Sequence, residues 1–186
     1  IAALAAVGML DVEVSVGPRV GIISTGDELV DVGAAPAPGQ VRDMNSYALH
    51  TAVRLAGARP EILGIVRDDY TSLAQALSDA LPRVDMLIMS GGSSIGARDF
   101  AREAIDSLGK PGVLVHGIAV KPGKPTIIAV ADGVPVFGLP GHPVSCLTVF
   151  RLLVEPAIAR WMGGRLVSRE LVARIGANVA SAAGRE

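Results

Sequence analysis

Four short segments carry side chains suited to binding anions or metal ions, and each directly follows an expected β-strand. They are residues 24–28 (STGDE), 90–100 (SGGSSIGARDF), 121–125 (KPGKP) and 139–145 (LPGHPVS). In open α/β sheets, ligands bind beyond the carboxyl ends of the strands. The sequence therefore predicts that all four segments lie at one edge of a sheet.

The KPGKP segment places two lysines on a stiff loop. Lys121 and Lys124 are two of only three lysines in a chain whose other basic residues are arginines. Two prolines restrict the backbone, and Gly123 permits a tight bend. The lysine ammonium is a compact point charge, whereas the arginine guanidinium is a planar group that donates two parallel hydrogen bonds. A loop with two lysines therefore suits a compact oxyanion. The alternative is a solvated basic turn.

The SGGSSIGARDF segment combines a glycine turn with hydroxyl groups. Gly91 and Gly92 let the backbone approach a ligand closely. Ser93 and Ser94 add hydroxyls before a helix start whose free N–H groups attract anions. Asp99, at that helix start, is either a cap or a metal ligand. The alternative is an ordinary glycine-rich turn, and the segment matches neither a dinucleotide-binding fingerprint nor a P-loop.

Acidic residues follow the first strand. Asp27 and Glu28 are of the type that holds Mg²⁺ beside phosphates, and the alternative is an acidic surface loop. No nucleophile–base pair stands out elsewhere in the sequence. The residues together therefore predict metal-assisted group transfer by positioning and charge stabilisation.

The LPGHPVS segment opens the last expected helix. Ser145 falls in the first turn, beside unpaired N–H groups, which indicates a second anion site; the alternative is an ordinary strand–helix junction. His142 is either a ligand contact or a cap, and Cys146 is expected to be a small packed side chain. Residues 42–46 (RDMNS) contact a polar ligand or cap a helix, and we favour capping by Asp43.

Continuous apolar runs alternate with amphipathic segments along the chain, and the Asp132-Gly133 pair is a hairpin signal. The expected strands are 12–16, 19–24, 61–66, 84–89, 113–120, 126–130 and 134–139, and the expected helices are 1–9, 44–56, 68–81, 99–108 and 143–162. This alternation predicts an α/β fold, a three-layer α/β/α sandwich with a mostly parallel sheet and one antiparallel strand late in the chain.

Composition excludes several function classes. The formal charge of −1 gives no field for nucleic acid or anionic lipid, and aromatic residues, at 3%, are too few for base stacking. No apolar run reaches the ~18–20 residues of a membrane span. The single cysteine excludes a disulfide framework and fits a reducing compartment, so we expect a cytoplasmic protein without nucleic-acid or membrane partners.

Six motifs, in this order and spacing, resemble the molybdopterin molybdenumtransferase family, which includes bacterial MoeA and the gephyrin E domain. They are STGDEL (24–29), RDMNSY (42–47), GIVRDD (64–69), SGGSSIGARDF (90–100), KPGKP (121–125) and GLPGHPVS (138–145). The resemblance implies that 16–163 is a molybdopterin-binding domain with a MogA-like fold. It implies that 1–15 ends a preceding domain, with a helix and a connecting strand, and that 164–186 begins a truncated C-terminal β domain.

The family's activity is the insertion of molybdate into adenylylated molybdopterin, with Mg²⁺-dependent release of AMP. The resemblance implies catalytic roles for Glu28, Asp99 and Lys124, and a Mg²⁺ site at Glu28 and Asp99, with Asp27 as a second choice. Lys121, Lys124 and Ser145 would hold molybdate or the adjacent phosphate. The remaining implied contacts to the substrate are Thr25, Gly26, Gly91, Gly92, Ser93, Ser94, Pro140 and Gly141.

The family also implies a homodimer and contacts to other enzymes of molybdenum cofactor biosynthesis. Because a sheet edge alone is an open surface and group transfer needs water excluded, we expect no turnover by this chain alone. Three positions depart from the family pattern: Ala97 replaces an acid, Ser93 a valine and His142 an asparagine. Two other functions are alternatives, a MogA-type molybdopterin adenylyltransferase and a non-catalytic molybdopterin-binding or scaffold module. The KPGKP and PGHPVS motifs favour the molybdenum-inserting branch.

Overall fold

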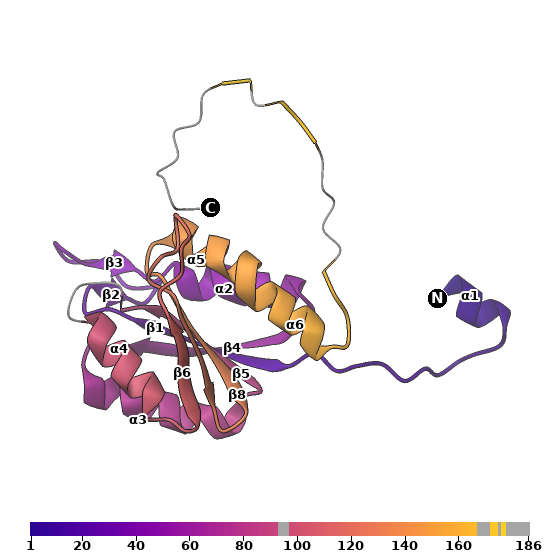
Figure 1. Ribbon diagram of the computed structural model, residues 1–186, viewed down its shortest axis with the longest axis horizontal. Helices are drawn as coiled ribbons and strands as arrows, with labels where there is room; N and C mark the ends of the chain where they lie inside the picture. The colour runs from indigo at the N-terminus through magenta and orange to yellow at the C-terminus, as the bar shows by residue number, and fades with distance from the viewer. Residues whose placement is uncertain (93–96, 167–171, 175, 178–186) are drawn as a thin grey trace.

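Six strands of the computed structural model pair into one sheet, and the chain is described at residues 1–92, 97–166, 172–174 and 176–177. Their spatial order is β4 (Arg59–Val66), β1 (Arg19–Thr25), β5 (Met86–Gly91), β8 (Val134–Leu139), β7 (Ile127–Ala131) and β6 (Pro111–His116) (Figure 1). Strands β4, β1, β5 and β8 are parallel, and β7 runs antiparallel to both of its neighbours. The predicted hairpin at Asp132-Gly133 is confirmed, with φ angles of 47° and 91°.

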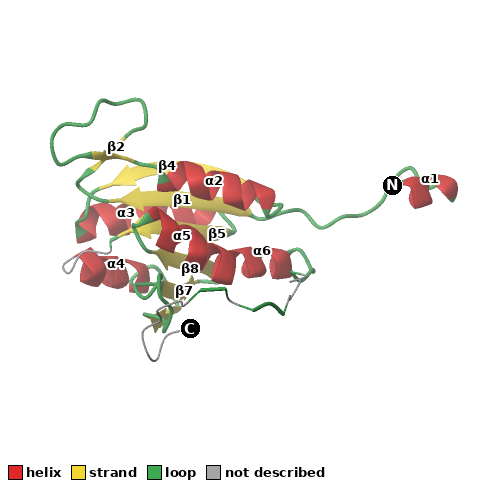
Figure 2. Cartoon of the chain, turned by 90° about the horizontal axis from the view of Figure 1, so that it is seen from above, coloured by secondary structure: helices red, strands yellow, loops and turns green. Residues whose placement is uncertain are grey.

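Helices cover both faces of this sheet (Figure 2). One face carries α2 (Asn45–Leu55), α5 (Pro143–Val149) and α6 (Glu155–Trp161), and the other carries α3 (Tyr70–Ala80) and α4 (Ala97–Asp106). The predicted three-layer α/β/α sandwich with a mostly parallel sheet is therefore confirmed.

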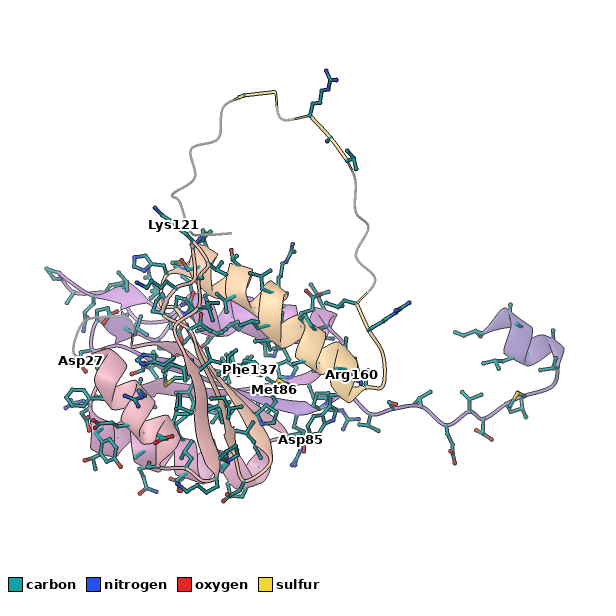
Figure 3. The ribbon with its side chains drawn as sticks, in the orientation of Figure 1. Asp27, Asp85, Met86, Lys121, Phe137 and Arg160 are labelled. Atoms are coloured by element: carbon teal, nitrogen blue, oxygen red, sulfur yellow. The ribbon has the colours of Figure 1, made fainter. Side chains whose placement is uncertain are left out.

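The core divides into two layers because successive strand residues point to opposite faces. Ile22 of β1 packs in a cluster with Leu49 of α2 and Phe150, whereas Ile23 packs with Leu73 and Leu77 of α3. Met86 and Phe137, labelled in Figure 3, belong to the first of these clusters. In β5, residues 86–89 are all hydrophobic and buried, as expected for a strand that is covered by helices on both faces.

The last predicted helix contains a local widening. Helices α5 and α6 are joined by a π turn, Phe150–Val154, rather than by regular α-helix. Pro156 provides the physical reason, because it has no N–H for the carbonyl of Leu152 and its ring crowds that carbonyl.

The N-terminal segment differs from the prediction. Helix α1 (Ala2–Ala6) forms, but the strand expected at 12–16 does not, and this segment extends away from the sheet (Figure 1). The three valines of that segment are 45–76% exposed. Alternating valines favour a strand only where a neighbouring strand supplies hydrogen bonds, and this segment has none among the described residues. The domain boundaries after 15 and 163 stay predictions.

Smaller differences occur in two loops. Two-residue strands β2 (Leu29–Val30) and β3 (Val41–Arg42) pair in parallel inside the region expected to be a loop. Strand β6 ends at His116, earlier than predicted, because the chain turns at Gly117, whose φ angle is 89°. A short 3₁₀ turn, Leu81–Arg83, follows α3 where Pro82 interrupts the helix.

We expect the Leu77→Ala variant to lose about 2–5 kcal/mol of unfolding free energy, because Leu77 is fully buried between α3 and the sheet. Leu55→Ala is the matched control: Leu55 ends α2 and is 83% exposed, so its loss should stay within about 0.5 kcal/mol. Denaturant-induced unfolding measures both. Equal losses for the two variants would contradict this assignment of the core.

Candidate functional site

The carboxyl ends of three neighbouring strands meet at one edge of the sheet. In the ladder, Thr25 of β1 pairs with Gly91 of β5, and Ser90 pairs with Leu139 of β8. A pocket of about 370 Å³ opens beyond these ends. Its lining residues are Thr25, Glu28, Leu29, Val41, Arg42, Asp43, Met44, Asn45, Asp68, Ser90, Gly91, Gly92, Gly141, His142 and Pro143.

Five of the predicted site residues therefore surround one pocket: Thr25, Glu28, Gly91, Gly92 and Gly141. Two more lie beside it, since Gly26 and Asp27 line an adjoining hollow next to β4. Pro140 is buried below the pocket, and Ser145 is half-buried in the first turn of α5. The structure brings these segments together; the roles of the individual residues stay predictions.

The lysine loop occupies a different part of the same edge. It follows β6, which lies two strands beyond β8, and both Lys121 and Lys124 are exposed and outside the pocket lining. Figure 3 shows Lys121 apart from Asp27, on the loop that rises beside α5. A side chain at Gly123 would meet Val149 of α5 at 2.6 Å, so the loop is packed against that helix.

Three predicted residues cannot be placed in full. Ser93 and Ser94 lie outside the described residues. Asp99 lies in the first turn of α4, and its side chain is likewise outside the description.

Carboxylates gather on one wall of the pocket. The Thr25 hydroxyl donates to Asp68 at 2.5 Å, and the backbone N–H of Asp68 contacts the Asp27 carboxylate at 3.4 Å. The Glu28 side chain folds over Gly26, within 2.8 Å of where a Cβ would lie. Partial burial raises the pKa of Asp68; the Thr25 hydrogen bond opposes this, and repulsion from Glu28 and Asp27 adds to it.

In the sequence, Asp68 stands only at the expected start of the 68–81 helix. The cap of α3 is Asp69, which accepts a hydrogen bond from the N–H of Ser72 at 2.9 Å. That hydrogen bond lowers the pKa of Asp69. Asp68 therefore does not cap the helix, and it lines the pocket instead. The spacing of residues in the sequence did not indicate this position in the pocket.

The start of α2 forms the opposite side of the site. Asp43 accepts hydrogen bonds from the Ser24 hydroxyl at 3.0 Å and from the N–H of Ser46 at 3.1 Å, so the predicted capping role is confirmed. Arg42 also lines the pocket, and its Nε donates to the carbonyls of Val32 and Ala34, which holds the 31–40 loop in place.

Asn45 links the end of β5 to the turn between β8 and α5. Its amide Nδ2 donates to the Ser90 hydroxyl and to the Gly141 carbonyl, both at 2.7 Å. These partners lie far away in the sequence, so only the fold reveals the contact. Ser90 also lies 3.7 Å from the Cys146 sulfur, and burial raises the pKa of Cys146 to about 11. Cys146 is thus a packed thiol, as predicted.

Gly91 is required by its surroundings. Its φ angle is 121°, and a Cβ there would lie 2.0 Å from the carbonyl oxygen of Thr25. The glycine therefore permits β1 and β5 to end side by side.

Within the described ranges, no three or more His, Cys, Asp or Glu side chains are grouped so as to hold a metal ion. A cation at this site would therefore take part of its coordination from a ligand or water. None of the described helices is long and apolar enough to cross a membrane.

Comparison with known families identifies the domain. Residues 21–160 match the family described as a probable molybdopterin binding domain, and the chain belongs to this family. The likeness extends to a solved structure of the MoeA molybdopterin biosynthesis protein from Pyrococcus horikosii, with a TM-score of 0.79 and 46% identity over 87% of this chain and 40% of that one. The resemblance drawn from the motifs is confirmed.

Curated relatives carry the name molybdopterin molybdenumtransferase. The chain is 41% identical to the Nostoc sp. protein over 88% of its own length and 38% of the relative, and 39% identical to molybdopterin molybdenumtransferase 1 of Mycobacterium tuberculosis over 98% and 43%. The chain thus spans about 40% of the length of these relatives. A structure titled molybdenum cofactor biosynthesis protein B, 20% identical with a TM-score of 0.63, shares the fold.

We expect Gly91→Ala to lower the unfolding free energy by at least about 2 kcal/mol, because the strained backbone and the contact with Thr25 add together. Gly64→Ala is the control: its φ angle of 113° is similar, but nothing lies within 4 Å of its Cβ position. Thermal unfolding compares them. If Gly91→Ala loses no more unfolding free energy than Gly64→Ala, the close approach of Gly91 to Thr25 does not contribute to the loss.

Asp68→Asn should stabilise the chain at neutral pH, raising the melting temperature by about 1 °C. The folded pKa of Asp68 is raised, so its ionised form costs stability above that pKa, and the cost disappears as pH falls through it. Asparagine keeps the acceptor for Thr25 and removes the charge. Melting curves across pH should converge in acid; a variant less stable than wild type at pH 7 contradicts the prediction.

Proposed function

We propose that the chain is the molybdopterin-binding domain of a molybdopterin molybdenumtransferase and acts in molybdenum cofactor biosynthesis. The proposed reaction is the insertion of molybdate into adenylylated molybdopterin with Mg²⁺-dependent release of AMP. The observation that carries the proposal is the pocket itself, which is lined both by Gly91 and Gly92 and by the acidic residues Glu28 and Asp68. Relatives of the same name, at 39–41% identity, support it.

The residues of the pocket fit a magnesium ion. Glu28 and Asp68 line it, and the raised pKa of Asp68 reflects, after burial, the repulsion among neighbouring carboxylates, which a bound cation would relieve. Mg²⁺ usually takes one or two carboxylates and completes its shell with phosphate and water, so a larger protein cluster is not required. When bound, the ion would neutralise charge on the phosphate; Asp99 is the other proposed ligand.

The protein's own groups position the adenylate. Gly91 and Gly92 admit a phosphate close to the backbone because no side chain blocks the approach. Thr25 holds Asp68 in place through its hydroxyl, and Asp43 holds the start of α2 against β1. These contacts keep the walls of the pocket fixed before the substrate arrives, which lowers the entropic cost of orienting it.

The lysine loop supplies the second half of the site in this proposal. Lys121 and Lys124 stand outside the pocket, so a substrate that contacts both regions must be extended. Adenylylated molybdopterin is such a molecule, with its adenylate at one end and its dithiolene-bearing pterin at the other. Ser145, between the pocket and the loop along the edge, would contact molybdate or the adjacent phosphate.

We further propose that the domain works within a longer homodimeric enzyme, because the relatives are more than twice the length of this chain. An open sheet edge leaves water in contact with the reacting groups, whereas group transfer needs both substrates held and water excluded. Turnover would then depend on further parts of the protein, and binding alone would remain in this chain.

In the proposed longer enzyme, Lys121→Ala and Lys124→Ala should each weaken molybdate use by about 10- to 100-fold, since each removes a charge-assisted hydrogen bond worth roughly 1.5–3 kcal/mol. Both residues are exposed, so thermal stability should hardly change. Lys124→Arg should restore molybdate use only in part. The molybdate concentration for half-maximal rate measures this; unchanged values in both alanine variants would remove the loop from the site.

The proposed function is tested by incubating that enzyme with adenylylated molybdopterin, Mg²⁺ and varied molybdate, and measuring AMP. AMP release that requires both Mg²⁺ and molybdate supports the proposal. Synthesis of adenylylated molybdopterin from molybdopterin and ATP would instead support the adenylyltransferase alternative. Binding without either reaction would support the scaffold alternative.

A further inference from the structure

Asn45 joins three segments that are distant in the sequence. It is the first residue of α2 and is 8% exposed. Its Nδ2 donates one hydrogen bond to Ser90 at the end of β5 and another to the Gly141 carbonyl in the turn between β8 and α5. Both acceptors belong to the wall of the pocket.

The amide is energetically unusual in this position. Its Oδ1 atom is buried and has no hydrogen-bond partner among the residues that the structure describes. A buried acceptor without a partner destabilises a fold, and an apolar side chain here would avoid that cost. The two N–H bonds of Asn45 are therefore the contacts that account for an amide at this place.

The helix that carries Asn45 is anchored independently of these bonds. Leu49 and Val53 are fully buried against the sheet, and Asp43 ties the helix start to Ser24 and Ser46. Removing the amide of Asn45 would leave the helix seated. It would, however, remove the hydrogen bonds to the Ser90 hydroxyl and the Gly141 carbonyl. The turn after β5 and the turn after β8 would then no longer be held at a fixed distance from each other.

We propose that Asn45 is a positioning residue: it holds the Gly91–Gly92 turn and the Gly141–Pro143 turn at the separation that the bound adenylate requires. This rests on the proposed function for the identity of the ligand. Aspartate has the same shape but no donors, and it would set a carboxylate against the Gly141 carbonyl. The Ser90 hydroxyl can donate to this carboxylate, so Asn45→Asp breaks the link at the Gly141 carbonyl, which has lost its donor. A negative charge in the first turn favours α2 and offsets part of the cost of burying the carboxylate.

The test compares the 186-residue chain with Asn45→Asp, Asn45→Ala and a control, Leu49→Ala. The control loosens the same helix from the core but touches neither turn. Calorimetric titration with AMP in the presence of Mg²⁺ measures affinity, and amide hydrogen exchange reports on Gly91, Gly92 and Gly141. Exchange is compared at equal distance below each melting temperature.

We expect both Asn45 variants to bind AMP at least about tenfold more weakly and to exchange faster in both turns. Leu49→Ala should lose more thermal stability and yet keep wild-type affinity and turn protection. Wild-type behaviour of Asn45→Asp in both measurements, or equal losses in the control, overturns the proposal. If the wild-type chain fails to bind AMP, the proposed function loses its support. In that case, the hydrogen-exchange rates in the two turns alone test whether Asn45 positions them.

Discussion

The parallel alignment of β1, β5 and β8 determines where the walls of the pocket lie. It brings the segments that follow these three strands to one edge, and Gly91 lets β5 end against the Thr25 carbonyl. Hydrogen bonds tie several groups of the pocket to these strand ends. Asp68 is held through Thr25, the start of α2 through Ser24, and the β8–α5 turn through Asn45.

Charge distribution along this edge follows from the same topology. The carboxylates of Asp27, Glu28 and Asp68 follow β1 and β4, at one end of the sheet, whereas Lys121 and Lys124 follow β6 at the other. The two lysines are thus separated from these carboxylates along the edge. An extended anion that meets a cation at one end and ammonium groups at the other fits this arrangement better than a compact one.

Much of the fold was predictable from local pattern. Continuous apolar runs predict buried strands such as β1 and β5, and the Asp132-Gly133 pair predicts a hairpin turn. Glycine indicates where a helix ends. The prediction of a strand at 12–16 was wrong. Alternating apolar and polar residues indicate which side of a strand would be buried, but a strand also needs a neighbouring strand to pair with. Sequence placed the lysines at the correct edge but could not give the strand order that separates them from the pocket. The contacts of Asn45 depend on tertiary structure and carry no local signal.

In the proposed function, the adenylate binds in the pocket that Glu28 and Asp68 line. The most direct measurement is an NMR titration of the isotope-labelled chain with AMP, with and without Mg²⁺. We expect Mg²⁺-dependent shifts concentrated on the amides of Thr25, Gly91, Gly92 and Gly141. Shifts centred instead on the groove between α2 and α5, lined by Leu55, Leu147 and Thr148, or equal shifts without Mg²⁺, would contradict it.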